Sequence, residues 1–286
     1  MGAMKWVVGV VAGCVVIGSA GADGVTLFAA KDNTLYESST GSLSNGAGSS
    51  FFSGVTAGGE IRRGLIEFDI AAAVPAGSTI NSAMLVLNMS RTVSGPQPLS
   101  LHAATREWGE GTSNASGQEG SGAVASDGDA TWVHAVFDSA GGSILWTNPG
   151  GDFVATASAT VSVGGVGSYT WSGPGVVSDV QGWLDDPSGN HGWVIVGEEE
   201  SLATSKRFDS RENINAANRP RLVIDFTPPA VCAPDLNNDG VLNFFDVQAF
   251  LQAFSVQDPV ADFNNDSQFD FFDVQAFLQA FSAGCP

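Results

Sequence analysis

Basic residues are scarce in this sequence. Its 286 residues include 11 Lys and Arg against 30 Asp and Glu, which gives a formal net charge of −19. No Lys or Arg follows Arg221, although the last segment, 231–286, holds eight acidic residues. Phosphate contacts need clustered Lys and Arg, so we expect neither nucleic acid nor an anionic membrane as a partner. Regularly spaced carboxylates without basic neighbours point instead to a cation as ligand.

The start of the sequence lacks an apolar run long enough to cross a membrane. The apolar stretch 6–18 is shorter than the roughly 20 residues that a membrane-spanning helix needs. It follows Lys5 and precedes AGA at 20–22, which fits an A-x-A cleavage site, so residues 1–22 are predicted to be an export signal. The alternative is a lipoprotein signal with Cys14 as the lipidated residue. Either signal predicts an extracellular protein, secreted or anchored at the cell surface.

Cysteine is rare too, with three residues in the chain. Two remain after the predicted signal, Cys232 and Cys285, and an exported protein meets an oxidising environment. We therefore predict a disulfide between them, with two free thiols as the alternative. The bridge would join the ends of a small domain and restrict its unfolded chain by roughly 4 kcal/mol on the loop-entropy model.

Familiar catalytic signatures are missing from the sequence. It has no G-x-S-x-G, no H-E-x-x-H and no phosphate loop, and its three histidines are far apart. A glycosidase would need two carboxylates at a set separation, and the candidates are Glu110, Asp179, Asp185 and Glu212. We expect a protein without catalytic activity, and a polysaccharide-degrading enzyme is the alternative.

What the sequence does contain is a repeat. The phrase FFDVQAFLQAFS occurs at 244–255 and again at 271–282, and each copy completes a twelve-residue loop, DLNNDGVLNFFD or DFNNDSQFDFFD. Both loops carry oxygen side chains at positions 1, 3, 5, 9 and 12, the spacing of a calcium loop. We predict two Ca²⁺ sites, with these ligands: Asp235, Asn237, Asp239, the carbonyl of Val241, Asn243 and Asp246 in the first loop, and Asp262, Asn264, Asp266, the carbonyl of Gln268, Asp270 and Asp273 in the second.

The two loops differ at position 6, where a sharp turn requires positive φ. Gly240 suits this position, whereas Ser267 should cost on the order of 1 kcal/mol of strain there. The second loop has four carboxylates against three in the first. We expect both loops to bind, the second more weakly or more slowly.

Each repeated phrase is predicted to form the helix that leaves its loop. Apolar residues recur at i, i+3, i+4 and i+7, so each helix has one apolar face: Val247, Phe250, Leu251 and Phe254 in the first copy, and Val274, Phe277, Leu278 and Phe281 in the second. The two helices can pack on each other, and metals and a disulfide would stabilise so small a domain. The alternative is an acidic helical hairpin without metal.

The segment 232–286 resembles a dockerin domain, and its flanking Cys232 and terminal GCP make it most similar to the GC-type variant. The resemblance implies a calcium-loaded module that anchors secreted proteins to cohesin partners. In dockerins, loop positions 10 and 11 help to recognise the partner, and here these are Phe244, Phe245, Phe271 and Phe272. These apolar pairs replace the small hydroxyl residues common in dockerins, so we expect a cohesin-like or another surface anchoring protein. One ring of each pair is expected to be core.

The long segment 23–227 is predicted to be an antiparallel β-sandwich of the jelly-roll type, because short apolar stretches recur between Gly, Ser and Asn. The expected strands are RRGLIEFDI (62–70), SAMLVLNM (82–89), FVATASATVSV (153–163), HGWVIVG (191–197) and RPRLVIDF (219–226). One helix is expected within 177–187, with Ser178 as its cap, Pro187 as its stop and an apolar face of Val180, Trp183 and Leu184. Residues 228–231 are the expected linker.

A second resemblance lies in this segment. The motifs RRGLIEFDI, PAGSTINSAMLVL, WGEGT, DVQGWLDDPSGNHGWVI, KRFDSRE and ANRPRLVIDF follow the order found in the DNRLRE domain family, part of which is classed as carbohydrate-binding module family 96. The resemblance implies a secreted β-sandwich found beside polysaccharide-active enzymes, with some members binding anionic glycans.

Glycan binding needs exposed aromatic rings and planar polar groups. Trp108, Trp132, Trp146 and Trp171 lie among Gly, Ser and Thr, where loops are expected. The candidate glycan-binding residues are Arg62, Arg63, Trp108, Lys206, Arg207 and Arg211. Against a polyanion, the segment has ten basic and 22 acidic residues. The alternatives are that the tryptophans pack in the core and that Arg62 and Arg211 form structural ion pairs with Glu67, Asp69 or Glu212.

Three hypotheses follow from the sequence. The first is a secreted polysaccharide-binding protein without catalytic activity, anchored through a calcium-dependent domain. The second is a polysaccharide-degrading enzyme, and the third is a purely structural surface protein that binds no sugar.

Overall fold

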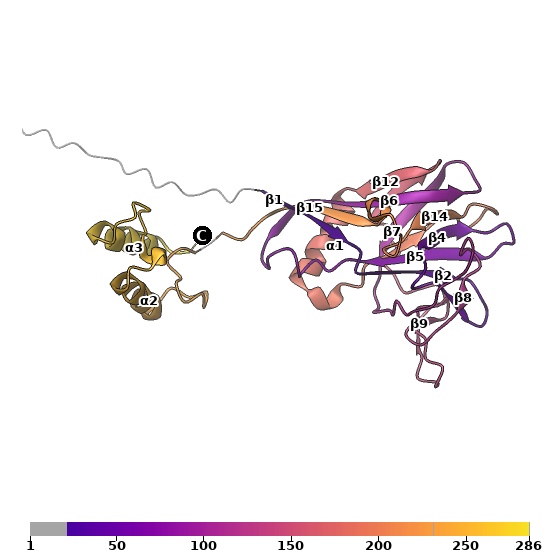
Figure 1. Cartoon of the computed structure of the whole chain (residues 1–286), viewed down its shortest axis with the longest axis horizontal. Coiled ribbons are helices and arrows are strands. Elements are labelled where there is room, and N and C mark those ends of the chain that lie inside the picture. Colours follow the sequence, from indigo (N-terminus) through magenta and orange to yellow (C-terminus); the bar gives the residue numbers. More distant parts are fainter. Residues whose placement is uncertain (1–21, 231, 286) are drawn as a thin grey trace, which may run out of the picture. The chain divides into compact units, whose positions relative to one another are not determined.

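The computed structural model describes residues 22–230 and 232–285, which divide into two compact units between Pro228 and Pro229 (Figure 1). This boundary falls in the predicted linker. The predicted export signal lies outside the described residues, apart from Ala22. None of the helices in the described ranges is long and apolar enough to cross a membrane.

The front unit is almost entirely antiparallel β structure. Its strands are β1 (Asp23–Phe28), β2 (Lys31–Tyr36), β3 (Leu43–Ser44), β4 (Ser50–Val55), β5 (Ile61–Glu67), β6 (Thr79–Thr92), β7 (Gln97–Ala103), β8 (Ala123–Val124), β9 (His134–Val136), β10 (Ile144–Leu145), β11 (Ala159–Val163), β12 (Gly167–Ser172), β13 (Trp193–Val196), β14 (Lys206–Asp209) and β15 (Arg221–Thr227). Four of the five expected strands are confirmed, as β5, β6, β13 and β15.

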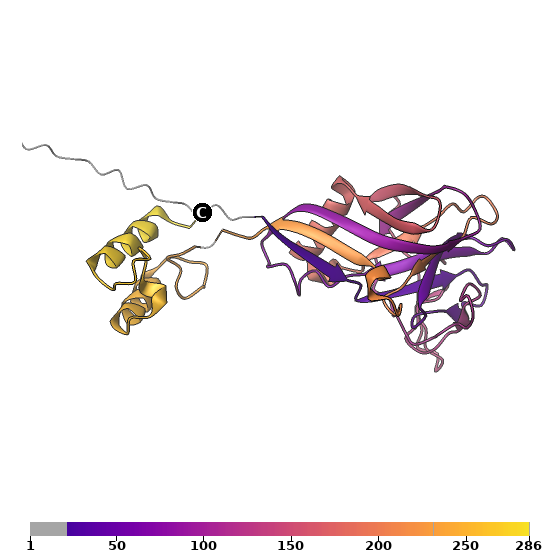
Figure 2. The same ribbon diagram turned by 45° about the horizontal axis from the view of Figure 1, so that its top comes forward.

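Eleven of these strands form one curled sheet in the order β1-β15-β6-β14-β4-β5-β13-β7-β11, with β12 also paired to β6 and β2 to β5. The curl is centred on β4, which pairs with β14 on one side and β5 on the other. One layer therefore contains β6 and β15 and the other contains β5 and β13 (Figures 1 and 2). The fold agrees with the predicted β-sandwich class.

The main core lies between the two layers. Alternate residues of β6 point into it, among them Leu85, Leu87 and Met89, as the period of a half-buried strand requires. The ring of Phe208 lies between those of Phe51 and Trp171, with centroids 5.5 and 6.1 Å away.

The expected alternating strand at 153–163 is only half right. Phe153 makes an isolated bridge to Ala104, and the strand β11 starts at Ala159. The N–H groups of Val154 and Ser158 donate to carbonyls of β7 that are only two residues apart, Ala103 and Leu101. The extra residues between them must bulge away from β7, so the alternation there does not form a ladder.

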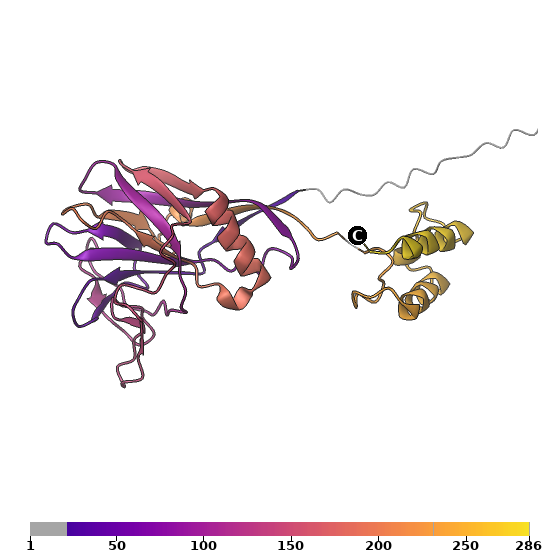
Figure 3. The same cartoon turned by 180° about the vertical axis from the view of Figure 1, so that it is seen from behind.

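A single α-helix, α1 (Pro174–Asp185), packs against the sheet within the described front unit (Figure 3). Its buried residues include the expected face of Val180, Trp183 and Leu184, and it ends before Pro187, as predicted. Its start is not at Ser178, because Pro174 occupies the first turn, where a missing N–H costs nothing. Two 3₁₀ turns complete the unit: η1 (Pro187–Gly189) and η2 (Ala216–Asn218).

The second unit contains α2 (Phe244–Ser255), the 3₁₀ turn η3 (Pro259–Ala261) and α3 (Phe271–Ala283). The predicted disulfide between Cys232 and Cys285 is confirmed, with the two Cα atoms 4.9 Å apart. The core centres on Phe250 and Phe277, whose rings stack with centroids 4.2 Å apart and an interplanar angle of 6°. The ring of Phe263 packs edge-on against both.

One part of the predicted helix faces is wrong. Leu251 and Leu278 are 56% and 51% exposed, so neither belongs to the core. The space beside the stacked rings of Phe250 and Phe277 is filled by residues of the preceding loops, such as Leu236 and Phe263, rather than by these leucines.

Replacing Phe277 by Ala should strongly destabilise the second unit. Truncation of a buried Phe typically costs about 3–5 kcal/mol, because it removes apolar burial and leaves a cavity. The matched control is Leu278→Ala at the neighbouring, half-exposed position, which should cost much less. Scanning calorimetry of the full chain should show that Phe277→Ala strongly lowers the melting transition of the second unit, whereas Leu278→Ala changes it little. Equal shifts for the two variants would contradict this description of the core.

Candidate functional site

The two repeated loops are closed by the same hydrogen bonds. The carboxylate of Asp235, at position 1, accepts the N–H groups of Asp239 and Gly240 at 3.2 and 2.9 Å. Asp262 does the same in the second loop, where Asp266 and Ser267 donate at 3.1 and 2.9 Å. The first predicted ligand of each loop therefore sets its curvature.

The last predicted ligand of each loop is buried. Asp246 is 0% exposed and accepts the N–H groups of Asn237 and Asn243, at 3.3 and 2.9 Å. The N–H of Asn243 is the main reason that the pKa of Asp246 lies below its ordinary value. Asp273 is equally buried and makes the equivalent contacts in the second loop. Positions 9 and 12 thus cap α2 and α3, placing carboxyl groups at helix N-termini, where the helix dipole favours negative charge.

Position 6 has positive φ in both loops: 78° at Gly240 and 63° at Ser267. Ser267 therefore adopts the left-handed conformation that its Cβ disfavours, which is the strain expected from the sequence. Position 4 is also left-handed in both copies, with φ of 55° at Asn238 and 58° at Asn265. Asn tolerates this region best after Gly, so the two loops share one backbone path.

The donors of both loops suit Ca²⁺ in their chemistry. Carboxylate, amide and carbonyl oxygens are hard ligands, and neither loop contains a thiol or imidazole. Within 22–230 and 232–285, no group of three or more His, Cys, Asp and Glu side chains is gathered as a metal site. The predicted sites also depend on Asn side chains and backbone carbonyl oxygens. In each loop the Asn at position 3 donates instead to the Asp at position 5, at 2.8 Å from Asn237 and 3.0 Å from Asn264.

The four phenylalanines at loop positions 10 and 11 all face solvent. Phe244 and Phe271 are 72% and 71% exposed, and Phe245 and Phe272 are 63% and 61% exposed. The expectation that one ring of each pair belongs to the core is wrong, because the Asp at position 12 takes the buried place at the start of each helix. The second unit thus has two equivalent apolar pairs on its surface.

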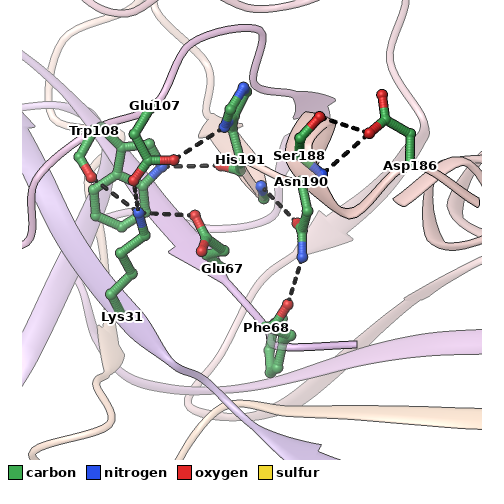
Figure 4. Close-up of polar contacts among 10 residues, drawn as sticks. Lys31, Glu67, Phe68, Glu107, Trp108, Asp186, Ser188, Asn190 and His191 are labelled. Atoms are coloured by element: carbon green, nitrogen blue, oxygen red, sulfur yellow. Dashed lines mark hydrogen bonds and ion pairs between the residues drawn. The ribbon is translucent and has the colours of Figure 1, made fainter. Parts of the chain in front are cut away.

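The tryptophans expected in exposed loops are buried, so Trp108 cannot stack on a sugar ring in this structure. It is 1% exposed, and its indole N–H donates to the carbonyl of His191 at 2.9 Å. Lys31 places its Nζ 4.5 Å from the centroid of the Trp108 ring (Figure 4). The other three follow the same pattern, with exposures of 9% for Trp132, 5% for Trp146 and 0% for Trp171.

Lys31 is the centre of the network in Figure 4, where its ammonium pairs with Glu67 at 2.9 Å and Glu107 at 2.6 Å. Burial raises the pKa of Glu67. Burial opposes the shift at Glu107, but the contacts with Lys31 and His191 outweigh it and lower the pKa. Two carboxyl groups with separated pKa values can act as an acid and a base in catalysis. Here the ammonium of Lys31 binds both groups, so the network has a structural role and joins β2, β5 and the loop after β7.

Two of the basic candidates are also buried. Arg62 is 6% exposed, lies 4.8 Å from the centroid of the Tyr36 ring and donates to the carbonyls of Ile61 and Gly120. Lys206 is 0% exposed, and its Nζ donates to oxygens of Thr92, Ser94 and Gly95. The assignment of both residues to a glycan site is therefore corrected: they satisfy carbonyl and hydroxyl oxygens inside the fold.

Arg211 forms structural ion pairs, as the alternative interpretation of the sequence held. Its Nε and Nη2 donate to the two carboxylate oxygens of Glu110 at 2.5 and 2.6 Å, and its Nε also lies 2.9 Å from Glu212. Of the four carboxylates considered for catalysis, these two are brought together, but around a guanidinium. Asp179 instead accepts the indole N–H of Trp193, and Asp185 accepts from Gln181.

The carboxyl group of Asp32 is buried beside this ion pair. Asp32 is 1% exposed, and burial together with the nearby charge of Glu212 raises its pKa well above the ordinary value. Its Oδ2 accepts the backbone N–H of Arg211 at 2.8 Å, which opposes the shift only in part. Ionised Asp32 is therefore a cost to the folded state.

The last two candidates line hollows. Arg207 borders a small one of about 180 Å³ together with Phe52 and Arg91, and it donates to Gln118 at 2.8 Å. Arg63 lines a larger one of about 660 Å³, where its guanidinium forks onto Glu199 with two contacts of 2.8 Å. Two of the six candidates thus line hollows in the described front unit.

Sequence reasoning did not single out the other side chains of the larger hollow. Arg106 and Asn148 both line it, and Asp152 connects them by accepting from Arg106 Nε at 2.8 Å and from the N–H of Asn148 at 3.1 Å. The sequence feature that could have indicated this wall of the hollow is TNPGGD at 147–152, a turn rich in Pro and Gly that ends in an acidic residue. Nothing local links that turn to Arg106.

No family model matches the sequence, and no curated protein is significantly similar to it. What the chain does must therefore be inferred from its own residues.

Replacing Asp32 by Asn should change how the stability of the front unit depends on pH. A carboxyl whose pKa is raised on folding binds its proton more tightly in the folded state, so stability falls as the pH rises from 3.8 toward the folded-state pKa. The amide of the variant keeps an acceptor for the N–H of Arg211 but has no charge to bury. The melting temperature of the variant should thus gain on that of the wild type as the pH rises above the ordinary carboxyl pKa of 3.8, by about 2–4 °C for each kcal/mol. A difference that does not vary with pH would contradict the assignment.

Proposed function

We propose that this is an extracellular protein that binds polysaccharide without cleaving it and attaches through its second unit in a calcium-dependent way. One observation carries the attachment part. In both loops a buried Asp at position 12 closes the loop onto its helix, while the two phenylalanines just before it are exposed. The predicted ligands of each loop point toward the loop itself, whereas the neighbouring phenylalanine rings face solvent. This arrangement suits a module in which a bound cation fixes the loop that presents an apolar surface.

Calcium would supply the counter-charge that the second unit lacks. The unit carries eight carboxylates and no Lys or Arg, so N–H groups can stabilise these charges but only an external cation can neutralise them. Asp235, Asp239 and Asp246 would hold one Ca²⁺ with Asn237, Asn243 and the carbonyl of Val241. The second ion would be held by the equivalent residues of the other loop, from Asp262 to Asp273. Bound in this way, the ion would neutralise the loop and hold its two ends together.

The exposed phenylalanine pairs are the proposed contact with the partner. The rings of Phe244 and Phe245 have centroids 6.3 Å apart, and so have those of Phe271 and Phe272. Exposed apolar clusters of this kind usually mark interaction sites, because leaving them in water is unfavourable. A cohesin-like protein or another surface anchoring protein with an apolar pocket fits this surface. Because the pairs are duplicated, either copy could dock.

The absence of catalysis is proposed from the state of the carboxylates. Glu110 and Glu212 are paired with Arg211, and Asp179 and Asp185 each accept a side-chain hydrogen bond elsewhere. A general acid or nucleophile must instead reach the substrate. The sandwich is proposed to bind glycan because of its resemblance to the DNRLRE family and because it offers a polar hollow beside an aromatic ring.

Calcium titration of the full mature chain, after chelation, should reveal two sites. Asp235→Ala and Asp262→Ala should each leave one site, because each removes the first ligand of one loop. Asp258→Ala is the control, since Asp258 caps η3 and lies outside both loops. Isothermal titration calorimetry measures the stoichiometry. A single site in the wild type, or an unchanged stoichiometry in both loop variants, would contradict the proposal.

Attachment should depend on the exposed phenylalanines. The double variant Phe245→Ala, Phe272→Ala should lose retention on the surface of the producing cells while still binding calcium. Leu251→Ala, Leu278→Ala is the matched control, because these leucines are also exposed on α2 and α3 but lie outside the loops. Immunoblotting of washed cells against medium gives the retained fraction. Full retention of the phenylalanine variant would exclude these rings as the contact.

A further inference from the structure

The larger hollow of the front unit has the size and composition of a ligand site. Its volume of about 660 Å³ lies within the usual range of small-molecule sites, roughly 300–1,000 Å³. Arg63 comes from β5, Thr105 and Arg106 come from the loop after β7, and the rest come from the turn 147–153. Residues far apart in the sequence therefore converge on one surface.

The turn that forms one wall is held in place by its own acid. Asp152 accepts the N–H groups of Thr147 and Asn148 at 2.9 and 3.1 Å. The glycine at 150 has φ of 93°, and a Cβ there would lie 2.6 Å from the Nη1 of Arg63, so no larger residue fits. A wall built in this way is rigid before any ligand arrives, which lowers the entropy cost of binding.

Arg63 lines the hollow with a side chain that is held firmly in place. Its guanidinium forks onto Glu199, donates to the carbonyl of Gly150 at 2.9 Å and lies 5.1 Å from the ring centroid of Trp132 and 5.3 Å from that of Phe153. Its position is therefore fixed by a carboxylate, a carbonyl and two rings. Its charge is already paired, so it offers a ligand the flat face of its guanidinium and not an unpaired charge.

Arg106 and Asn148 supply the open hydrogen-bonding groups. Arg106 has a side chain 40% exposed and uses Nε for Asp152 and Nη2 for Thr147, which leaves other N–H groups of its five-donor fork without a partner among the described residues. Asn148 is exposed, and its side-chain amide makes no hydrogen bond within the described part of the chain. Together they offer both donors and acceptors.

The charges of the hollow cancel. Arg63 is paired with Glu199 and Arg106 with Asp152, while Glu198 and Glu200 flank the first pair in the sequence. Burial opposes the shift, but the N–H of Thr147, the contact with Arg106 and the N–H of Asn148 outweigh it and lower the pKa of Asp152, so this acid is ionised at neutral pH. A uronate or sulfate would have to compete with carboxylates already in place, in a unit with 22 acidic and ten basic residues.

We infer that this hollow, defined by Arg63, Arg106, Asn148, Asp152 and Phe153, binds a neutral, hydroxyl-rich stretch of polysaccharide and discriminates against polyanionic glycans. A sugar hydroxyl both donates and accepts, so it can accept from Arg106 and Asn148 and donate to Asp152 without breaking an ion pair. The half-buried ring of Phe153 lies in the same wall and can cover an apolar sugar face. This inference rests on the proposed polysaccharide binding, and it adds the class of glycan and the place where the glycan binds.

Affinity electrophoresis of the full mature chain tests this. The gels contain neutral polymers (hydroxyethyl cellulose, galactomannan, xyloglucan) or anionic ones (alginate, polygalacturonate, dextran sulfate). The wild type should be retarded by at least one neutral polymer and by no anionic one. Asn148→Ala and Arg106→Gln should weaken that retardation by about three- to tenfold each, the loss expected for one or two hydrogen bonds. Arg91→Ala, beside the smaller hollow, is the control and should migrate as the wild type does, with unchanged melting temperatures for Asn148→Ala and Arg91→Ala.

The outcomes separate the inference from the proposed function. Retardation by anionic polymers alone would overturn the neutral ligand class and keep polysaccharide binding. Retardation by a neutral polymer that survives both Asn148→Ala and Arg106→Gln would overturn the site. No retardation in any gel would overturn both and favour the structural surface protein.

Discussion

The shortage of positive charge is the constraint on which the rest of this structure depends. Carboxylates outnumber Lys and Arg by 30 to 11, and in the front unit several cations are held in ion pairs between its own residues. Lys31 pairs with Glu67 and Glu107, and Arg211 with Glu110 and Glu212. Such pairs tie loops to strands, and breaking one would leave a partly buried charge alone, which costs more than the pair contributes. These cations thus belong to the framework, and the surface keeps its negative charge.

The second unit meets the same constraint without any cation. Its carboxylates accept hydrogen bonds from backbone N–H groups, both where each loop closes and at the N-termini of α2 and α3. Its core consists largely of the stacked rings of Phe250 and Phe277, and the disulfide joins its ends. On this account bound Ca²⁺ supplies the positive charge that the second unit lacks.

Much of the fold could be predicted from local patterns. The strands β5, β6, β13 and β15 are compact apolar runs, and the helices α2 and α3 follow loops with a strict spacing of oxygen side chains. The disulfide could be predicted because only two cysteines follow the predicted signal. The strands and helices depend on residues that are close in sequence, and the disulfide depends on a pairing for which only one combination of cysteines was available.

The candidate glycan site was predicted poorly because its features are non-local. The segment between β7 and β11 looks like exposed loop, but it folds over the outer face of β2, β5 and β13 and builds a second core with Leu35, Leu65 and Val194 (Figure 1). Three tryptophans, Trp108, Trp132 and Trp146, are buried there. The partner of Arg63, Glu199, is 136 residues away, so its neutralisation cannot be seen in the sequence.

The most direct test of the calcium account is an NMR titration of the mature chain with Ca²⁺ that follows the amides of Gly240 and Ser267. Each of these N–H groups donates to the first carboxylate of its loop, at 2.9 Å in both cases. The account predicts that both signals shift and saturate at about two equivalents of Ca²⁺, the number that two such loops imply, while amides of β6 stay unchanged. Signals that do not move at either position in excess Ca²⁺ would contradict it.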